Sequence, residues 1–231
     1  MPFRQSDTPQ VTQAYVIPFV LYLFGTSFLA RFGDEWYPLL YGGLVLGMLV
    51  YLAWLLVSRP ILQPHWRVLP GVAIGLVGIV LWIALASLHL EDHLTQWLPK
   101  WLRPESRVAY NPLEQLSGMQ AWAFITLRLL GIAVVVPIAE ELFWRGFLLR
   151  WLIDPEWQRV PVGEFTLSSC LTVTLMFTLA HPEWLAAAVY CLLLNGLLYW
   201  KKDLWLCIVA HAVSNFALAM YVLATGAWWL W

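Results

Sequence analysis

The sequence predicts an all-α, polytopic membrane protein with about seven to eight transmembrane spans. Of the 231 residues, 61% are hydrophobic and only 12% are charged, whereas a soluble domain is about half apolar and a quarter charged. The chain has 16 tryptophans, and tryptophan collects at membrane–water interfaces. The apolar residues also fall into runs that approach the length of about 20 residues needed to cross a bilayer as a helix.

These runs define the expected helices in chain order: 14–30, 37–57, 69–89, 119–153, 166–180, 184–200 and 204–223. The first has no small-residue cleavage site, so we expect a retained helix and not a signal peptide. The run 119–153 is too long for one simple span. Pro137 is expected to kink it, because proline lacks an N–H and clashes with the preceding turn. Seven spans follow, or eight if the two halves of this run turn back on each other.

The polar connections predict an orientation. The longest, 90–118, is expected to lie along the interface because it mixes aromatic and basic residues, namely Trp97, Lys100, Trp101, Arg103 and Arg107. Lys and Arg are enriched in cytoplasmic loops. A cytoplasmic N-terminus with seven spans places eight of them inside, Arg4, Arg59, Arg67, Arg145, Arg150, Arg159, Lys201 and Lys202, and four outside, Arg31, Lys100, Arg103 and Arg107. We therefore predict that the N-terminus is cytoplasmic.

Charge and cysteine content exclude some classes of function. The net charge of −1 offers no basic surface for nucleic acid. Cys170, Cys191 and Cys207 all lie inside apolar runs. Such cysteines are typically small buried hydrophobes, so we expect neither disulfides nor a cysteine metal cluster.

The stretch PIAEELFWRGFLLRW, residues 137–151, places three charged groups in an apolar run. Charges inside a span are costly and mark candidate functional residues. Residues four apart share a helix face, so Glu141 and Arg145 can form an ion pair, which would either pack two helices or serve a site. Glu140 is turned roughly 100° away from Glu141. Without that partner, Glu140 is a candidate general base.

Two further stretches carry polar groups next to or within apolar helices. FTLAHPEW places His181 at the end of a helix, just before Pro182, with Phe177 one turn earlier on the same face. VAHAVSNF places His211 and Asn215 four residues apart on one face. Taken singly, each could be a packing feature, because polar side chains hydrogen-bond across helix interfaces in membranes.

Other polar residues in the spans carry less weight. Ser214 lies off the face shared by His211 and Asn215. Arg128 is expected to snorkel or to meet a carboxylate, and Asn195 and Arg150 are expected to be packing and interface residues.

The three stretches together form a plausible hydrolytic set. Attack of water on a peptide carbonyl needs a base for the water, an acid for the leaving amine and donors for the oxyanion. One carboxylate, two histidines and an amide supply these groups. The chain contains no G-x-S-x-G, G-x-x-x-x-G-K or H-E-x-x-H motif and no Cys–His arrangement, so no other nucleophile or common zinc helix competes.

The ordered set E-E-x-x-x-R at 140–145, F-x-x-x-H at 177–181 and H-x-x-x-N at 211–215 resembles the CPBP family of intramembrane proteases. That family includes the type II CAAX prenyl endopeptidases and the Abi proteins of bacteriocin processing and immunity. On this resemblance, 118–223 is the catalytic core, 1–117 forms membrane-anchoring helices with an interfacial loop, and 224–231 is a C-terminal tail.

The resemblance implies an active site in a cavity within the membrane. It implies that Glu140 activates water with His181 beside it, and that His211 and Asn215 stabilise the oxyanion. The positioning residues would be Glu141, Arg145 and Phe177. The implied substrate is a peptide bond in a membrane-associated or lipidated polypeptide, surrounded by lipid, in a bacterial inner membrane. We expect access to the cavity from the cytoplasmic side.

Several alternatives stay open. The polar cluster would also suit a non-catalytic scaffold or a bacteriocin-immunity protein, and intramembrane ionisable groups would suit a proton-coupled transporter. Glu140, His181 and His211 match a catalytic zinc ligand set with water in the fourth position. The metal-free scheme gives every residue a role, including Asn215, so no cofactor is favoured and zinc is the alternative.

Overall fold

The computed structural model describes residues 8–29, 31–33, 35–91, 95–99, 103 and 109–231, and there the chain is helical. The helices are α1 Thr8–Leu29, α2 Tyr37–Ser58, α3 Leu69–Ala86, α5 Pro112–Gln115, α6 Gly118–Leu130, η3 Gly131–Val135, α7 Val136–Glu141, η4 Leu142–Leu148, α8 Leu149–Trp151, η5 Trp157–Arg159, α9 Leu167–Leu179, α10 Trp184–Lys201, α11 Leu204–Thr225 and η6 Trp228–Leu230. The predicted all-α class is confirmed. Arg4, Lys100, Trp101 and Arg107 lie outside the described residues.

Each predicted apolar run is a helix. Among the described residues, six helical segments are long and apolar enough to cross a membrane. The run predicted at 119–153 is one of them, a continuous segment Gly118–Trp151, so its halves do not turn back and the eight-span alternative is wrong. The run predicted at 166–180 is the shorter apolar helix α9, Leu167–Leu179, which falls short of the length that spans a bilayer unaided.

The long segment is interrupted by two π-helical turns, η3 and η4. The turn η3 ends two residues before Pro137, which lies in α7. Proline offers no N–H to the helix ladder, and π-turns are a known place where a helix takes up an irregularity. The structure therefore places a π-turn just before Pro137, and the predicted kink stays a prediction.

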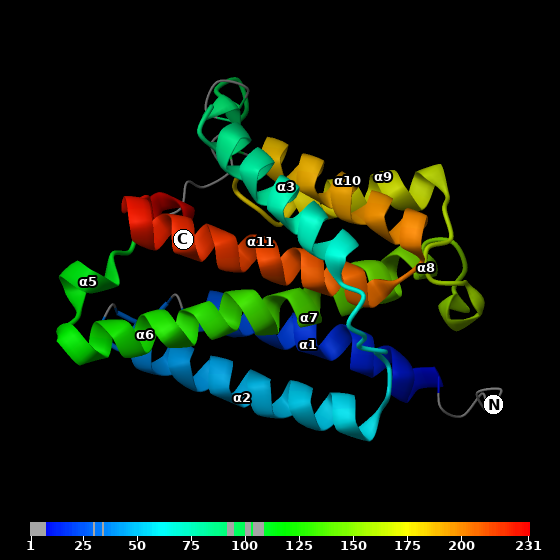
Figure 1. Ribbon diagram of the computed structural model, residues 1–231, viewed down its shortest axis with the longest axis horizontal. Coiled ribbons are helices and arrows are strands. Elements are labelled where there is room, and N and C mark those ends of the chain that lie inside the picture. The colour runs from blue at the N-terminus through cyan, green and yellow to red at the C-terminus, as the bar shows by residue number, and fades with distance from the viewer. Residues whose placement is uncertain (1–7, 30, 34, 92–94, 100–102, 104–108) are drawn as a thin grey trace.

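The start of α1 and α8 lie at one end of the bundle, and the C-terminus and α5 lie at the other (Figure 1). Side-chain hydrogen bonds join the segments at the first end: Arg59 to Gln10 at 3.1 Å, Trp157 to Thr12 at 3.1 Å and His65 to Asp203 at 2.6 Å. The start of α1 and the loops 59–68, 152–166 and 202–203 therefore share this end, as the predicted sequence of spans requires.

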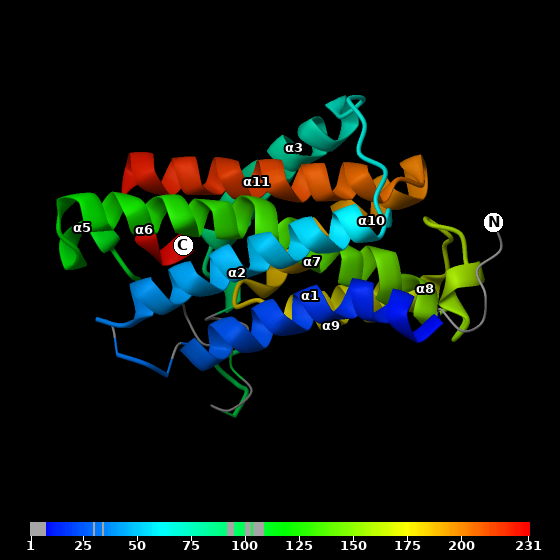
Figure 2. The same ribbon diagram turned by 90° about the horizontal axis from the view of Figure 1, so that it is seen from below.

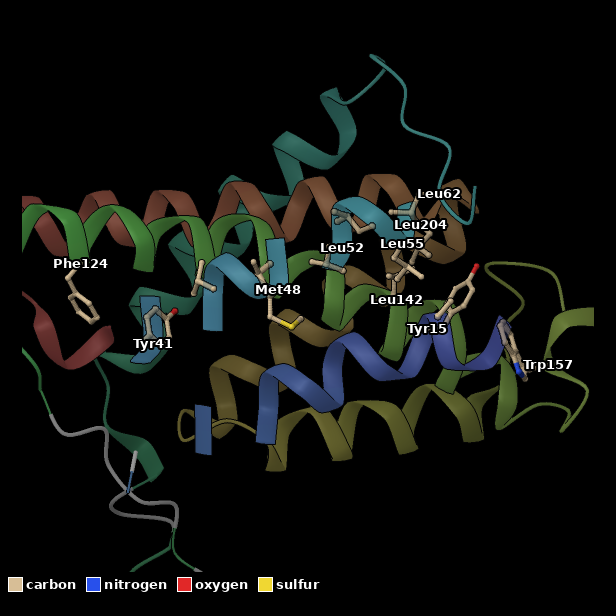
Figure 3. Packing of buried hydrophobic residues seen from close by; sticks show 14 residues of the cluster. Tyr15, Tyr41, Met48, Leu52, Leu55, Leu62, Phe124, Leu142, Trp157 and Leu204 are labelled. Carbon is tan, nitrogen blue, oxygen red and sulfur yellow. The ribbon is translucent and has the colours of Figure 1, made fainter. Parts of the chain in front are cut away.

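The long helical segment is central to the bundle. Seen from below, α6 lies between α11 and α2 (Figure 2), and both helices contact the long segment. Helices α1 and α2 pack against the long segment through a cluster of buried apolar residues (Figure 3), which includes Tyr15, Met48, Leu52, Phe124 and Leu142. The stretch with Glu140 and Glu141 is thereby enclosed by helices from both halves of the chain.

Helix α3 packs unusually closely on α11. A Cβ atom added at Gly71 would lie 2.7 Å from the carbonyl oxygen of Leu206, and one added at Gly75 would lie 2.5 Å from that of Ala210. Small residues allow membrane helices to approach this closely. The contact at Ala210 fixes the backbone immediately before His211.

Candidate active site

The Glu141–Arg145 ion pair predicted from the sequence is present and fully buried. Arg145 Nη1 donates to Glu141 Oε1 at 3.1 Å, and both side chains are 0% exposed. The guanidinium lies 5.0 Å from the centre of the Phe177 ring, and its Nη2 is 3.2 Å from the Sγ atom of Cys191. A buried charge is tolerated when its donors are satisfied, and Arg145 meets that condition.

Asn195 is the residue whose role the sequence did not reveal. It was expected to be an ordinary packing residue, but its Oδ1 accepts a hydrogen bond from Arg145 Nε at 3.1 Å, and Asn195 is fully buried. Asn195 is thus a buried packing residue, as expected, but its partner was not predicted because the two residues are 50 positions apart in the sequence. The available signal was a lone amide in the otherwise apolar run 184–200.

Glu141 also binds His211, so one carboxylate oxygen serves two partners. His211 Nδ1 lies 2.8 Å from Glu141 Oε1, the atom that accepts from Arg145. An ionised carboxylate only accepts hydrogen bonds, so Nδ1 carries the proton and donates it. The second ring nitrogen, Nε2, is therefore the one left for the cavity that His211 lines.

His181 is held at the C-terminal end of α9, as predicted. The helix ends at Leu179, and His181 Nδ1 is 2.7 Å from the carbonyl oxygen of Phe177. The two rings are stacked, with their centres 4.4 Å apart. A carbonyl only accepts, so Nδ1 is the donor, and in the neutral ring the lone pair lies on Nε2. Phe177 thus contacts both His181 and Arg145.

Asn215 and Ser214 lie on different faces of α11, as predicted. Asn215 Nδ2 donates to the carbonyl oxygen of Ile132, in the π-turn η3, at 2.7 Å. An amide group has two N–H donors, so this bond orients the second one. Ser214 bonds to the hydroxyl of Tyr190 and to the carbonyl oxygen of His211, which is a packing role.

Glu140 does not share the partner of Glu141, as the helix period predicted. Among the described residues it forms no ion pair, and its buried Oε2 has no hydrogen-bond partner. It lines the same cavity as His181, His211 and Asn215. A carboxylate oxygen without a protein partner is available to hold water.

The cavity has a volume of about 370 Å³. It brings together the four predicted catalytic residues, and α1, α2 and α3 complete its wall with Tyr22, Thr26, Tyr37, Tyr41, Gly78, Ile79 and Trp82. The N-terminal helices therefore form part of the cavity wall.

The cavity extends toward the end of the bundle that carries the C-terminus. Its wall reaches Tyr37, at the start of α2, and Trp231, and includes no residue of the loops 59–68, 152–166 or 202–203. Those loops lie at the N-terminal end, which was predicted to be cytoplasmic. The cavity therefore extends away from the end that the charge count assigns to the cytoplasm, because His181 follows the far end of α9. Access from the cytoplasmic side stays a prediction that depends on the orientation of the chain.

The possible zinc ligands do not assemble into a metal site. Within the described part of the chain, no group of three His, Cys, Asp or Glu side chains lies close enough to hold a metal ion. The Glu141–His211 bond resembles the support that metal-ligating histidines receive, but Glu140 and His181 do not complete the set.

The outer faces of the bundle are apolar, with Val50 72% and Phe24 67% exposed. Together with the six long apolar segments, this surface defines the class: a polytopic integral membrane protein with a polar cavity inside its helical bundle. Residues 121–217 match the family described as type II CAAX prenyl endopeptidase Rce1-like. The match confirms the resemblance that the three motifs indicated: residues 121–217 are similar to that family of membrane proteases. Neither the curated proteins nor the solved structures include a significant match to the chain.

Proposed function

We propose that the protein is an intramembrane endopeptidase that hydrolyses a peptide bond in a membrane-associated or lipidated polypeptide. The observation that carries the proposal is a single cavity lined by Glu140, His181, His211 and Asn215, which come from three separate segments of the chain. The family match of residues 121–217 supports the same reaction class.

In this scheme Glu140 is the base. Its unpartnered Oε2 takes a proton from a water molecule that attacks the scissile carbonyl. His181, whose neutral ring has its lone pair on Nε2, orients this water, receives the proton from Glu140 on Nε2 and passes it to the leaving amine. Removal of the proton and protonation of the amine are the two transfers that peptide hydrolysis needs.

His211 and Asn215 are the proposed donors to the oxyanion. The bond from Asn215 to Ile132 leaves the second N–H of the amide for the substrate. Donation from His211 Nε2 requires a proton on both ring nitrogens, and the Glu141 carboxylate balances the charge of that form. Fixed donors of this kind stabilise the charge that develops in the transition state.

Glu141, Arg145, Asn195 and Phe177 are positioning residues. Glu141 fixes the ring of His211, and Arg145 holds Glu141 in place. Asn195 and Phe177 in turn hold Arg145. The buried ion pair therefore acts on the reaction through the orientation of His211.

The test uses purified protein in lipid nanodiscs with a membrane-anchored reporter peptide. Wild type is expected to cleave the reporter, and Glu140→Gln is expected to lose essentially all cleavage while it keeps the thermal unfolding midpoint of wild type. Glu164→Gln is the matched control, because Glu164 is exposed and distant in sequence from the motifs. Cleavage by neither wild type nor Glu140→Gln would favour the non-catalytic scaffold.

The metal-free scheme makes a separate prediction. After exhaustive chelation, the protein is expected to keep its full rate of cleavage, because every step is assigned to a side chain. Elemental analysis of the same sample is the matching measurement. Stoichiometric zinc that is lost together with activity, and that restores activity when added back, would overturn the scheme and make Glu140, His181 and His211 candidate ligands.

A further inference from the structure

A second hollow, the α1–α2 groove, lies between the first two helices. These helices lie side by side (Figure 2). The groove has a volume of about 970 Å³ and shares no lining residue with the cavity that Glu140 lines. Its wall is formed by Val20, Leu21, Phe24, Gly25, Ser27, Phe28, Arg31, Gly43, Leu44, Gly47, Met48 and Tyr51.

Glycines explain why the groove is hollow. A Cβ atom added at Gly25 would lie 2.9 Å from the Cδ1 atom of Leu44, so this glycine lets α1 approach α2. Gly43 and Gly47 are one turn apart on α2, and nothing lies within 4 Å of the Cβ position of either. No side chain of the described residues therefore fills the groove along this turn of α2.

The groove has about the length of one membrane leaflet. It follows eight residues of rise on each helix, from Val20 to Phe28 and from Gly43 to Tyr51, which is about 12 Å. The hydrocarbon core of a bilayer is about 30 Å thick, so one leaflet covers about 15 Å. Arg31 follows the end of α1 at Leu29, and it therefore lies at the surface end of the groove.

Arg31 is the charged residue among those that line the groove. Its side chain is exposed, and among the described residues it forms no ion pair. Glu35, the described acidic residue nearest to it in the sequence, is not paired with it. A guanidinium presents donors in a planar fork that matches phosphate oxygens, and basic residues near the membrane surface attract anionic lipids.

We infer that the α1–α2 groove binds a phospholipid with a net negative headgroup. An acyl chain lies along the apolar groove over Gly43 and Gly47, and the phosphate binds Arg31 at its surface end. The inference goes beyond the proposed function and does not depend on proteolysis. It assigns to the first two helices a lipid site on the side of the protein that faces the bilayer.

A second copy of the chain is the competing occupant, because exposed glycines four residues apart also suit helix packing. Two observations favour the lipid. The groove is also lined by Phe24 and Phe28, which are 67% and 57% exposed, whereas close helix contacts are rich in small residues. In a twofold dimer about an axis normal to the membrane, the two copies of Arg31 would lie at the same depth on the shared face, and like charges repel.

The test counts bound lipids by native mass spectrometry. The purified protein in detergent is titrated with phosphatidylglycerol or with phosphatidylcholine that carries the same acyl chains. Wild type is expected to retain one phosphatidylglycerol per chain, with an affinity roughly fivefold higher than that for phosphatidylcholine, as for one basic residue near the surface. In Arg31→Gln the affinity for phosphatidylglycerol is expected to fall to that for phosphatidylcholine.

A second variant tests the apolar part of the groove. Gly43→Leu is expected to lose both lipids, because its side chain occupies the place of the acyl chain, and leucine is a better helix former than glycine. Gly196→Leu is the matched control, since Gly196 is an exposed glycine of α10 with nothing within 4 Å of its Cβ position. Arg67→Gln is the control for charge, because Arg67 is exposed and outside the groove. Both controls are expected to bind as wild type does.

Thermal unfolding gives a second readout, because a ligand that binds only the folded state raises the unfolding midpoint. Phosphatidylglycerol is expected to raise the midpoint more than phosphatidylcholine in wild type and in Arg67→Gln, and the two lipids are expected to act equally in Arg31→Gln. If Gly43→Leu does not fold, Arg31→Gln and Arg67→Gln decide the question.

Three results would overturn the inference. The first is equal retention of the two lipids by wild type. The second is a preference for phosphatidylglycerol that persists in Arg31→Gln, or that is lost to the same extent in Arg67→Gln. The third is efficient cross-linking between two Gly43→Cys chains with no lipid retained, which would make the groove an interface between copies of the protein.

Discussion

Glu141 shows what the sequence reveals about a single residue and what it hides. Its partnership with Arg145 follows from a spacing of four residues, which holds on any α-helix. Its bond to His211 joins residues 70 positions apart, and no local rule predicts such a contact. The motifs therefore predicted side chains that line one cavity. Which of these side chains bonds to which is visible only in the folded chain.

The oxyanion role of Asn215 predicts a graded loss. Asn215→Ala is expected to keep a trace of activity, with kcat lower by roughly 100- to 1000-fold, because it removes one oxyanion donor. The unfolding midpoint is expected to stay close to that of wild type. The measurement is single-turnover cleavage in nanodiscs together with thermal unfolding. If the variant instead loses folded protein, its bond to the carbonyl of Ile132 is its main contribution.

The buried ion pair predicts a difference between folding and activity. Arg145→Ala strands Glu141 in the core, which costs about 3–5 kcal/mol, so folded yield and activity are both expected to fall. The double variant Glu141→Gln, Arg145→Met removes both charges and is expected to recover yield better than activity, because His211 still lacks its carboxylate. Size-exclusion yield and cleavage rate are the two measurements. Normal values for Arg145→Ala would show that the pair is idle.

At the scale of elements, the apolar runs predicted the helices well and their irregularities less well. Length and hydropathy fix where a helix can lie in a bilayer. They did not predict the π-turns η3 and η4, since a π-turn depends on packing and on the neighbouring helix, here through the bond from Asn215 to Ile132. They also predicted that α9 spans the bilayer, whereas this helix is only 13 residues long and ends at Leu179, two residues before His181.

The close contact of α3 with α11 predicts an unusual effect of a small substitution. Gly→Ala normally stabilises a helix by up to about 1 kcal/mol. Gly75→Ala is expected to lower the unfolding midpoint and the activity, because its Cβ atom would lie 2.5 Å from the carbonyl oxygen of Ala210, next to His211. Gly47→Ala is the control, since nothing lies within 4 Å of its Cβ position.

Thermal unfolding in detergent and cleavage in nanodiscs measure the two effects. An unchanged Gly75→Ala protein would show that α3 and α11 separate without cost, and that the glycine contact does not position His211.

At the scale of the whole molecule, the end of the bundle toward which the cavity extends decides from which side of the membrane a substrate enters. The cavity extends toward the end that carries Trp231, and the count of basic residues predicts that this end faces outward. If both hold, the polypeptide reaches the site from the outer side. Charge bias in the loops sets the orientation of the chain in the membrane, whereas the position of the cavity depends on where α9 ends. The orientation is therefore predicted from the sequence, and the position of the cavity is seen in the structure.

The orientation can be measured directly. Cysteines introduced beside Lys201 are expected to react with an impermeant maleimide only after the cells are opened, and cysteines introduced beside Trp231 are expected to react in intact cells. Lys201 lies in the predicted cytoplasmic set, which motivates the first expectation. Labelling of the Lys201 region in intact cells would reverse the orientation and give the cavity a cytoplasmic mouth.

The three native thiols make the unaltered chain its own reporter of unfolding. Cys191 and Cys207 are 0% exposed and Cys170 is 7% exposed, and Cys191 contacts Arg145. A maleimide can modify them only in molecules whose core has opened, so the rate of modification follows the population of opened molecules when closing is fast. Pulsed alkylation would thus measure stability in native lipid, where solvent denaturation is difficult. Mass spectrometry would give the fraction of molecules that opened during the pulse, since each alkylated cysteine adds a fixed mass.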